Sequence, residues 1–243
     1  MTTALPAPPP LIELSGPPER RGQIYGEAAR ERIAAGIAHY SEQLGRSGLS
    51  AANKRAIIEE IIPKLDAFDA GYVPEMKGIA AGSNQPLEDI VLLNARTEML
   101  KLAHRPSAGA ATPKDPDPDG CTSVIIMPSA SADGRLVHAQ NWDWKVECAE
   151  TAVVLKIHND DGPDILAFTE AGQLARCGMN SAGIAITANY LECERDYRQL
   201  GVPLAVIRRK VLQQQMLALA MHTVYCTPKS AANNMIVSQA GGI

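Results

Sequence analysis

The spacing of apolar residues changes at a proline-rich stretch near the middle of the chain, and this change limits the folds open to it. Before the stretch, apolar side chains recur at steps of three and four residues, as at Ile33, Ile37, Tyr40 and Leu44, which is typical of one face of an α-helix. After it, short β-branched runs such as residues 122–127 are separated by turn residues, which is typical of strands. The sequence therefore predicts an α+β protein.

The same change divides the chain into two regions. Residues 1–120 form a predicted helical N-terminal region, which ends in a proline-rich linker at residues 106–119. Residues 121–243 form a predicted β-rich region. Because the linker has almost no side chains that could pack in a core, we expect it to be exposed.

Local patterns give the expected elements of each region. The helical region is predicted to open with a loosely held arm at residues 1–20, to kink at Pro63 and to break at residues 80–83, because proline and glycine interrupt helices. The elements predicted for the β-rich region are hairpins turning at 133–134 and 159–162, a strand at 184–188, a helix at 203–221 and a last strand from 233.

Charge and cysteine content exclude several classes of function. The chain has 243 residues and a net charge of −4, so it offers no basic surface for nucleic acid or an anionic membrane. Its five cysteines include no C-x-x-C pair, which argues against a disulfide framework or a zinc site and favours a reducing compartment. No signal-peptide pattern and no apolar run near the ~20 residues of a membrane helix occurs. We expect an intracellular protein, in the cytoplasm or a peroxisome, with a small-molecule partner and no metal or other cofactor.

One cysteine, Cys121, lies at the junction between the linker and the first predicted strand. Cleavage between Gly120 and Cys121 would leave a thiol and an α-amino group on the same residue. Since an α-amino group has a pKa of ~7.7–8.0, it suits the general base that activates such a nucleophile. The alternative is a buried cysteine at the start of a strand, and the other four cysteines are interpreted in that way, as small core hydrophobes.

Two polar residues follow later predicted strands. Asp143 lies between the two tryptophans of the chain, Trp142 and Trp144, about one hairpin of chain after Cys121. A carboxylate returned to that strand start could accept a hydrogen bond from the new α-amino group or orient the thiol. Asn189 ends a hydrophobic strand, where its amide could donate to an oxyanion. The alternatives are a strand-end turn with core aromatic residues around Asp143 and an ordinary turn asparagine at Asn189.

These residues lie within a set of short motifs that occur in a fixed order. The motifs are Gly-Cys-Thr-Ser at 120–123, Gln-Asn-Trp-Asp at 140–143, Thr-Glu-Ala-Gly at 169–172, Gly-Met-Asn-Ser-Ala-Gly-Ile at 178–184 and Gly-Val-Pro at 201–203. Residues 76–82 and 87–98 of the helical region add to the set. Together they resemble the acyl-coenzyme A:6-aminopenicillanic-acid (isopenicillin N) acyltransferase family, which is peptidase family C45.

The resemblance implies a fold and a set of site residues. The fold is the N-terminal-nucleophile (Ntn) hydrolase αββα sandwich, made as a precursor that cuts itself between Gly120 and Cys121 into two chains that stay together as a heterodimer. Cys121 is the implied nucleophile and Asp143 the site aspartate. Related bile-salt hydrolases imply that Asn189 lies in the oxyanion hole. Because chains of the family continue with further strands and site residues, we expect a sandwich truncated at Ile243 and a poorly active chain.

The predicted function is that of a self-processing cysteine acyltransferase or amidohydrolase. It would form an acyl-enzyme from an amide or an acyl-coenzyme A thioester and pass the acyl group to an amine or water. One alternative is an amidase or peptidase that acts on small N-acyl amino acids or peptides. The other is an inactive truncated fragment.

Overall fold

A six-stranded sheet forms the centre of the computed structural model, which describes residues 7–103 and 120–241. In spatial order its strands are β1 (Leu11–Leu14), β4 (Ala152–Ile157), β5 (Ile165–Glu170), β6 (Cys177–Asn180), β7 (Ile184–Asn189) and β8 (Asn234–Gln239). Strand β1 pairs parallel to β4, and all the other neighbours are antiparallel. A separate hairpin pairs β2 (Gly120–Ile126) with β3 (Val137–Asp143). The mixed helix-and-sheet class is confirmed.

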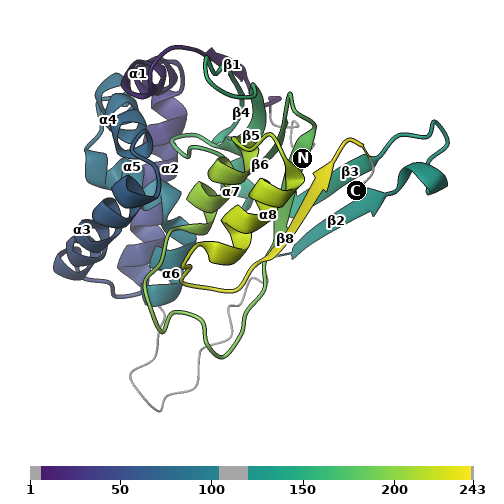
Figure 1. The fold of residues 1–243 in the computed structure, drawn as a ribbon. Helices are drawn as coiled ribbons and strands as arrows, with labels where there is room; N and C mark the ends of the chain where they lie inside the picture. The colour runs from purple at the N-terminus through teal and green to yellow at the C-terminus, as the bar shows by residue number, and fades with distance from the viewer. Residues whose placement is uncertain (1–6, 104–119, 242–243) are drawn as a thin grey trace, which may run out of the picture.

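Helices surround the sheet on the side away from the hairpin (Figure 1). The six helices described before the linker are α1 (Pro18–Ala28), α2 (Arg30–Arg46), α3 (Ala51–Phe68), α4 (Tyr72–Ser83), α5 (Leu87–Asn94) and α6 (Arg96–Ala103). Two more helices, α7 (Leu204–Leu212) and α8 (Leu217–Cys226), follow β7. Helices from both predicted regions therefore contribute to one hydrophobic core.

The alternation of side chains along the strands separates the two faces of the sheet. Val153 and Leu155 of β4 are buried in the same core as the helices. On the opposite face, Leu166 of β5 is 42% exposed and Met179 of β6 is 54% exposed. That second face is covered only in part, by the β2–β3 hairpin beside β7.

The hairpin turning at Asp133-Gly134 is confirmed, with Ile126 paired to Val137 next to the turn. Its inward side chains dock on the sheet through polar contacts. His138 of β3 lies between the hydroxyl groups of Thr187 on β7 and Ser238 on β8, with both N–O distances 2.8 Å. The imidazole therefore joins three strands, which gives His138 a structural role.

Helices α1 and α4 approach so closely that glycines separate their backbones. A Cβ atom at Gly78 would lie 2.0 Å from the carbonyl oxygen of Glu19, and one at Gly82 would lie 2.2 Å from that of Gln23. Such distances are far inside van der Waals contact, so only glycine fits. This contact explains a wrong prediction: residues 80–83 do not break the helix, which continues to Ser83 and ends at Asn84 in the left-handed region (φ 58°).

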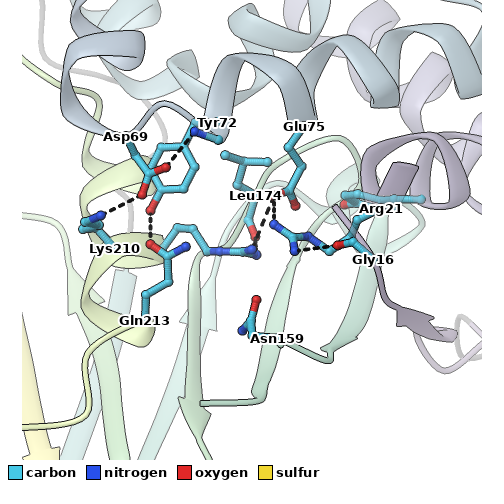
Figure 2. Close-up of polar contacts among 12 residues, drawn as sticks. Gly16, Arg21, Asp69, Tyr72, Glu75, Asn159, Leu174, Lys210 and Gln213 are labelled. Atoms are coloured by element: carbon cyan, nitrogen blue, oxygen red, sulfur yellow. Dashed lines mark hydrogen bonds and ion pairs between the residues drawn. The ribbon is translucent and has the colours of Figure 1, made fainter. Parts of the chain in front are cut away.

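A buried polar cluster fastens the same two helices to α7 (Figure 2). The carboxylate of Glu75 on α4 accepts hydrogen bonds from Arg21 Nη2 on α1 at 2.6 Å and from Arg209 Nη2 on α7 at 3.5 Å. Arg209 also donates to the carbonyl oxygen of Leu174. Nearby, Lys210 pairs with Asp69 at 2.7 Å. The cluster joins α1, α4 and α7, so its role is structural, and Nε of Arg21 and of Arg209 is left without a hydrogen-bond partner among the described residues.

Two further predictions are corrected. The expected arm contains β1, a strand of the sheet held by its pairing with β4. Helix α3 runs from Ala51 to Phe68 with Pro63 inside it, and the kink expected there stays a prediction. The helix expected at 203–221 is two helices, because the chain leaves the helical conformation at Met216 (φ −128°, ψ 138°). Within the described parts of the chain, no helix has the length and apolar character needed to span a membrane.

The α1–α4 contact predicts a large effect of a single methyl group. Gly78→Ala should lower the free energy of unfolding by about 1–3 kcal/mol or more, because the added carbon meets backbone that cannot move aside. Gly45→Ala in α2 is the matched control, since nothing lies within 4 Å of its Cβ position. It should raise stability by ~0.5–1 kcal/mol through helix propensity. Urea unfolding of both variants measures this, and equal effects would show that the helices can separate without cost.

Candidate active site

Cys121 is the second residue of β2 and lies directly opposite Trp142 of β3. Cross-strand partners project from the same face of a hairpin, so the thiol and the indole point together toward the six-stranded sheet. The burial pattern agrees, because both residues are partly buried and their neighbours Thr122 and Asn141 are exposed. The thiol is therefore placed between the hairpin and the sheet, at the end of the hairpin that follows the linker.

Asp143 lies opposite Gly120, the residue whose carbonyl precedes Cys121. A Cβ atom at Gly120 would be 3.3 Å from Oδ2 of Asp143, so the carboxylate packs directly against this glycine. Because side chains alternate along a strand, this carboxylate lies on the face opposite the Cys121 thiol. The geometry favours the first role considered for Asp143, a contact with the backbone nitrogen at Cys121, over a direct contact with the thiol.

Asn189 ends β7, and its side chain is fixed by the hairpin. Its Oδ1 atom accepts hydrogen bonds from Ser123 Oγ at 2.7 Å and from Gln140 Nε2 at 3.0 Å. Ser123 and Gln140 are themselves cross-strand partners, one pair along from Cys121 and Trp142. With Oδ1 engaged twice, the Nδ2 amide of Asn189 has no partner among residues 7–103 and 120–241. It remains a free donor in the space between hairpin and sheet.

Two further asparagines, Asn233 and Asn234, lie beside Asn189. The sequence analysis did not single them out as site residues. Asn234 opens β8 directly opposite Asn189, so the two side chains share the face toward the hairpin. Asn233 donates from Nδ2 to the backbone oxygen of Asn189 at 3.0 Å. The sequence predicted only that a last strand starts at Asn233. The pairing of β8 with β7 is what places these two side-chain amides next to Asn189.

Aromatic rings and arginines stack beside the thiol. The Cζ atom of Arg176 lies 3.9 Å from the centre of the Trp142 ring, and that ring is nearly parallel to Trp144, with centroids 6.5 Å apart. On the far side, Arg96 lies 4.7 Å from the Trp144 ring and 5.1 Å from the Tyr40 ring. The stack is favourable because cations are attracted to aromatic faces. It also fixes the rings that flank Asp143.

Glu170 at the end of β5 holds this stack together. Its carboxylate accepts hydrogen bonds from Arg96 Nε at 2.7 Å, from Gln173 Nε2 at 3.1 Å and from the Tyr40 hydroxyl. Tyr40 in turn accepts from Trp144 Nε1 at 3.0 Å. Burial alone would raise the pKa of Glu170, but the positive charges of Arg96 and Arg176 hold this pKa below its usual value. The group is therefore an anion at neutral pH.

A further arginine, Arg208 of α7, is only 5% exposed. Burial and the nearby charges of Arg176 and Arg96 lower the pKa of Arg208 to about 9. The Cys177 thiol lies within electrostatic reach of Arg176, Arg208 and Cys121, and burial raises its pKa above the usual value. Sequence reasoning missed Arg208, since the apolar stripe of α7 gave no reason to examine a charged residue between its members, and Arg176, just before β6, lay in no motif.

The other cysteines do not all agree with their interpretation as core hydrophobes. Cys148 is 2% exposed, and burial raises the pKa of its thiol to about 11. Cys177 is partly buried, whereas Cys193 and Cys226 are exposed, because they lie in a loop and at the end of α8. Within the described residues, no group of three or more His, Cys, Asp and Glu is placed to hold a metal ion.

Comparison with known proteins supports the resemblance found in the motifs. Residues 130–242 match the family model described as acyl-coenzyme A:6-aminopenicillanic acid acyl-transferase. The chain is 29% identical over 232 residues to the acyl-coenzyme A:6-aminopenicillanic-acid-acyltransferase 40 kDa form of Emericella nidulans. That match covers 95% of this chain and 57% of the relative, so the chain spans little more than half the relative's length. The predicted similarity to this acyltransferase family is confirmed.

The network around Glu170 predicts a large loss of stability on removal of its charge. Glu170→Gln should lower the free energy of unfolding by ~3–5 kcal/mol at pH 7, because it leaves Arg96 buried without its anion. Glu60→Gln is the control, since its pair with Lys64 at 3.4 Å is exposed and should contribute little.

The pH dependence of unfolding gives an independent reading of the same group. Because the folded pKa of Glu170 is lowered, its contribution is fully present above the ordinary carboxyl pKa and is lost as pH falls through the lowered value. Thermal unfolding of wild type should therefore show an acid loss that is smaller in Glu170→Gln. Identical acid profiles would assign the acid loss to other carboxylates.

Proposed function

We propose that this protein is a self-processing Ntn acyltransferase or amidohydrolase with Cys121 as its nucleophile. The observation that carries the proposal is the position of the Gly120–Cys121 bond, at the start of β2 with the Asp143 carboxylate packed against Gly120. Similarity to the acyltransferase family supports acyl transfer as the reaction class. The finer fold expected for such enzymes, the αββα sandwich, is part of the proposal.

The first step is cleavage of the chain. The Cys121 thiol adds to the carbonyl carbon of Gly120, the C–N bond breaks, and the released amine takes up the thiol proton. Water then opens the thioester, which leaves a carboxylate on Gly120 and a free thiol and amine on Cys121. Both reacting groups belong to adjacent residues, so proximity lowers the barrier. The two resulting chains remain joined through the shared core.

The second step uses the new terminus on a substrate. The α-amino group of Cys121 takes the thiol proton, and the thiolate attacks an acyl carbonyl to form a thioester with release of the leaving group. The carboxylate of Asp143, which packs against Gly120 before cleavage, holds this amine in position. The free Nδ2 donor of Asn189 stabilises the oxyanion, with Asn234 opposite it as a second candidate donor. An amine or water then takes the acyl group from the sulfur.

The acyl donor is proposed to be an amide or an acyl-coenzyme A thioester. The thioester is supported by the name of the Emericella nidulans relative, which specifies acyl-coenzyme A. Acyl transfer by this route requires only a thiol, a base and an oxyanion donor, which Cys121, its amine and Asn189 supply.

Cleavage itself is the first test. Wild-type protein should run as two fragments, and the larger should begin with Cys121. Cys121→Ala should stay as one chain because it lacks the attacking thiol, and Cys177→Ala is the control that removes a nearby thiol of the sheet. Intact mass and N-terminal sequencing give the result, and an uncut wild type with full acyl-transfer activity would refute the proposal.

Asp143→Asn is the second test. The amide keeps the packing against Gly120 and Trp142 but removes the charge that holds the amine, so turnover should fall by about 10²-fold or more. The melting temperature should change little. Asp133→Asn at the opposite end of the same hairpin, where Asp133 bonds Ser131 and the backbone of Arg135, should retain full turnover. A loss of turnover that merely follows a loss of melting temperature would make Asp143 a structural residue.

A further inference from the structure

The side-chain amide of Asn189 can take two orientations, and only one of them serves an oxyanion. An asparagine amide has an acceptor oxygen on one side and an N–H2 donor group on the other, and the two sides have nearly the same shape. The hydrogen-bond partners therefore decide which side faces the hairpin. The role proposed for Asn189 requires that the oxygen faces the hairpin and that the nitrogen stays free.

The contact with Ser123 does not decide between the two orientations. The Oγ atom of Ser123 lies 2.7 Å from Oδ1 of Asn189. A hydroxyl group has one O–H donor and two acceptor lone pairs, so it would bond the amide nitrogen as readily as the amide oxygen. Ser123 therefore holds the amide in place but fits either orientation.

Gln140 does decide, because its own orientation is set by the backbone. Its Nε2 atom donates to the backbone oxygen of Ala188 at 2.8 Å and to Oδ1 of Asn189 at 3.0 Å. A carbonyl oxygen only accepts, so the group of Gln140 that faces Ala188 must be the N–H2 group. The second N–H of the same nitrogen then requires an acceptor, and the atom of Asn189 in contact with it must be the oxygen.

Reversal of both amides would be unfavourable for the same reason. The Oε1 atom of Gln140 would then face the backbone oxygen of Ala188, and two acceptors in contact form no hydrogen bond. Loss of one hydrogen bond of ordinary strength lowers a population about fivefold, and the repulsion between the two oxygens lowers it further. The backbone of β7 thus fixes the amide of Gln140, and Gln140 fixes the amide of Asn189.

The hairpin register places these contacts beside the proposed nucleophile. Gln140 and Ser123 are cross-strand partners, as are Trp142 and Cys121. The two pairs are two residues apart along the strands, so they share one face of the hairpin and are separated by roughly 7 Å. The Asn189 amide therefore contacts the face of the hairpin that carries the Cys121 thiol, at the next pair along.

We propose that Gln140 is a positioning residue, which fixes the Asn189 amide with Nδ2 free to donate to the oxyanion formed on an acyl group at Cys121. This inference rests on the proposed function of Cys121 and adds a residue that acts through Asn189. A simpler role for Gln140 is docking of the hairpin on β7 through Ala188. Docking alone predicts a loss of stability without a specific loss of oxyanion binding, so the two roles can be separated.

Two reactions of the same thiol separate them. p-Nitrophenyl acetate acetylates the Cys121 sulfur through a tetrahedral oxyanion and releases p-nitrophenolate, and water then hydrolyses the thioester. Iodoacetamide alkylates the same sulfur by displacing iodide, and no oxyanion forms. Because both reactions require the thiolate, their ratio cancels any change in thiol ionisation. A Cys121→Ala background is subtracted, and peptide mapping assigns the alkylation, since Cys193 and Cys226 are exposed as well.

Three variants give the expected pattern. Gln140→Glu replaces the donor by an acceptor, which turns Nδ2 of Asn189 toward the hairpin and Oδ1 toward the oxyanion, so the ratio of acetylation to alkylation should fall by about 10²–10³-fold. Ser123→Ala should lower the ratio by less than about fivefold, because Gln140 still sets the orientation. His138→Ala is the matched control, since His138 docks the same hairpin through hydroxyl groups of β7 and β8. It should lower the melting temperature and leave the ratio unchanged.

Hydrogen exchange of the side-chain amides, followed by NMR of the wild-type protein, measures the orientation without any turnover. The N–H2 protons of Gln140 are both hydrogen-bonded, whereas Nδ2 of Asn189 has no partner among residues 7–103 and 120–241. The Gln140 protons should therefore exchange about fivefold or more slowly than those of Asn189.

Each outcome decides one question. A large fall of the ratio in Gln140→Glu with no change in His138→Ala supports the proposal. Equal ratios in these two variants, or an Asn189 amide that is protected while that of Gln140 exchanges freely, overturns it. A wild type that stays uncut and inactive refutes the proposed function instead, and the exchange rates then still show whether Gln140 orients Asn189.

A further variant covers the case in which Gln140→Glu does not fold. Gln140→Met removes the donor without adding an acceptor, so both orientations of the Asn189 amide become accessible. The ratio of acetylation to alkylation should then fall by about twofold to fivefold, and an unchanged ratio would overturn the proposal.

Discussion

The carboxylate of Glu170 is the point at which the helices, the sheet and the end of the hairpin meet. It lies at the end of β5, accepts from Arg96 of α6 and Tyr40 of α2, and reaches Trp144 through the tyrosine hydroxyl. A buried anion is stable only when its oxygens are hydrogen-bonded, so these partners must be in place together. Because Trp144 follows β3 by one residue, the position of Asp143 depends on contacts that helices α2 and α6 make with the end of β5.

The hairpin docks on strands β7 and β8 through polar contacts. These define its position on the sheet more closely than apolar contacts would. His138 bridges Thr187 and Ser238, and Ser123 and Gln140 both donate to Asn189. Apolar contacts are non-directional, whereas hydrogen bonds of fixed geometry define one position of the hairpin on the sheet. The same bonds that seat the hairpin also orient the Asn189 amide. Structural and proposed catalytic roles are therefore combined in one layer of side chains between the hairpin and β7.

Local sequence patterns were sufficient to predict the β2–β3 hairpin and the return of Asp143 to the start of β2. Turn chemistry at Asp133-Gly134 and the alternation of β2 return Asp143 to Gly120, as the register shows. Patterns failed where a tertiary contact outweighed a local preference. Gly82 breaks an isolated helix, but in α4 it is required by the approach of α1. Strand β1 was missed because four residues carry little periodicity and gain their conformation from pairing with β4. Arg176 and Arg208 could not be found, because only the fold brings them together with their neighbours.

The buried carboxylates Glu75 and Glu170 link elements that are far apart in the sequence. Glu75 and Glu170 each satisfy arginines that join one helix to another or to the sheet. Arg208 is buried as well, but its polar contact is to the backbone oxygen of Leu204 in its own helix. Leaving a buried cation unmatched lowers stability, and the fold could avoid this cost with an apolar residue of similar volume.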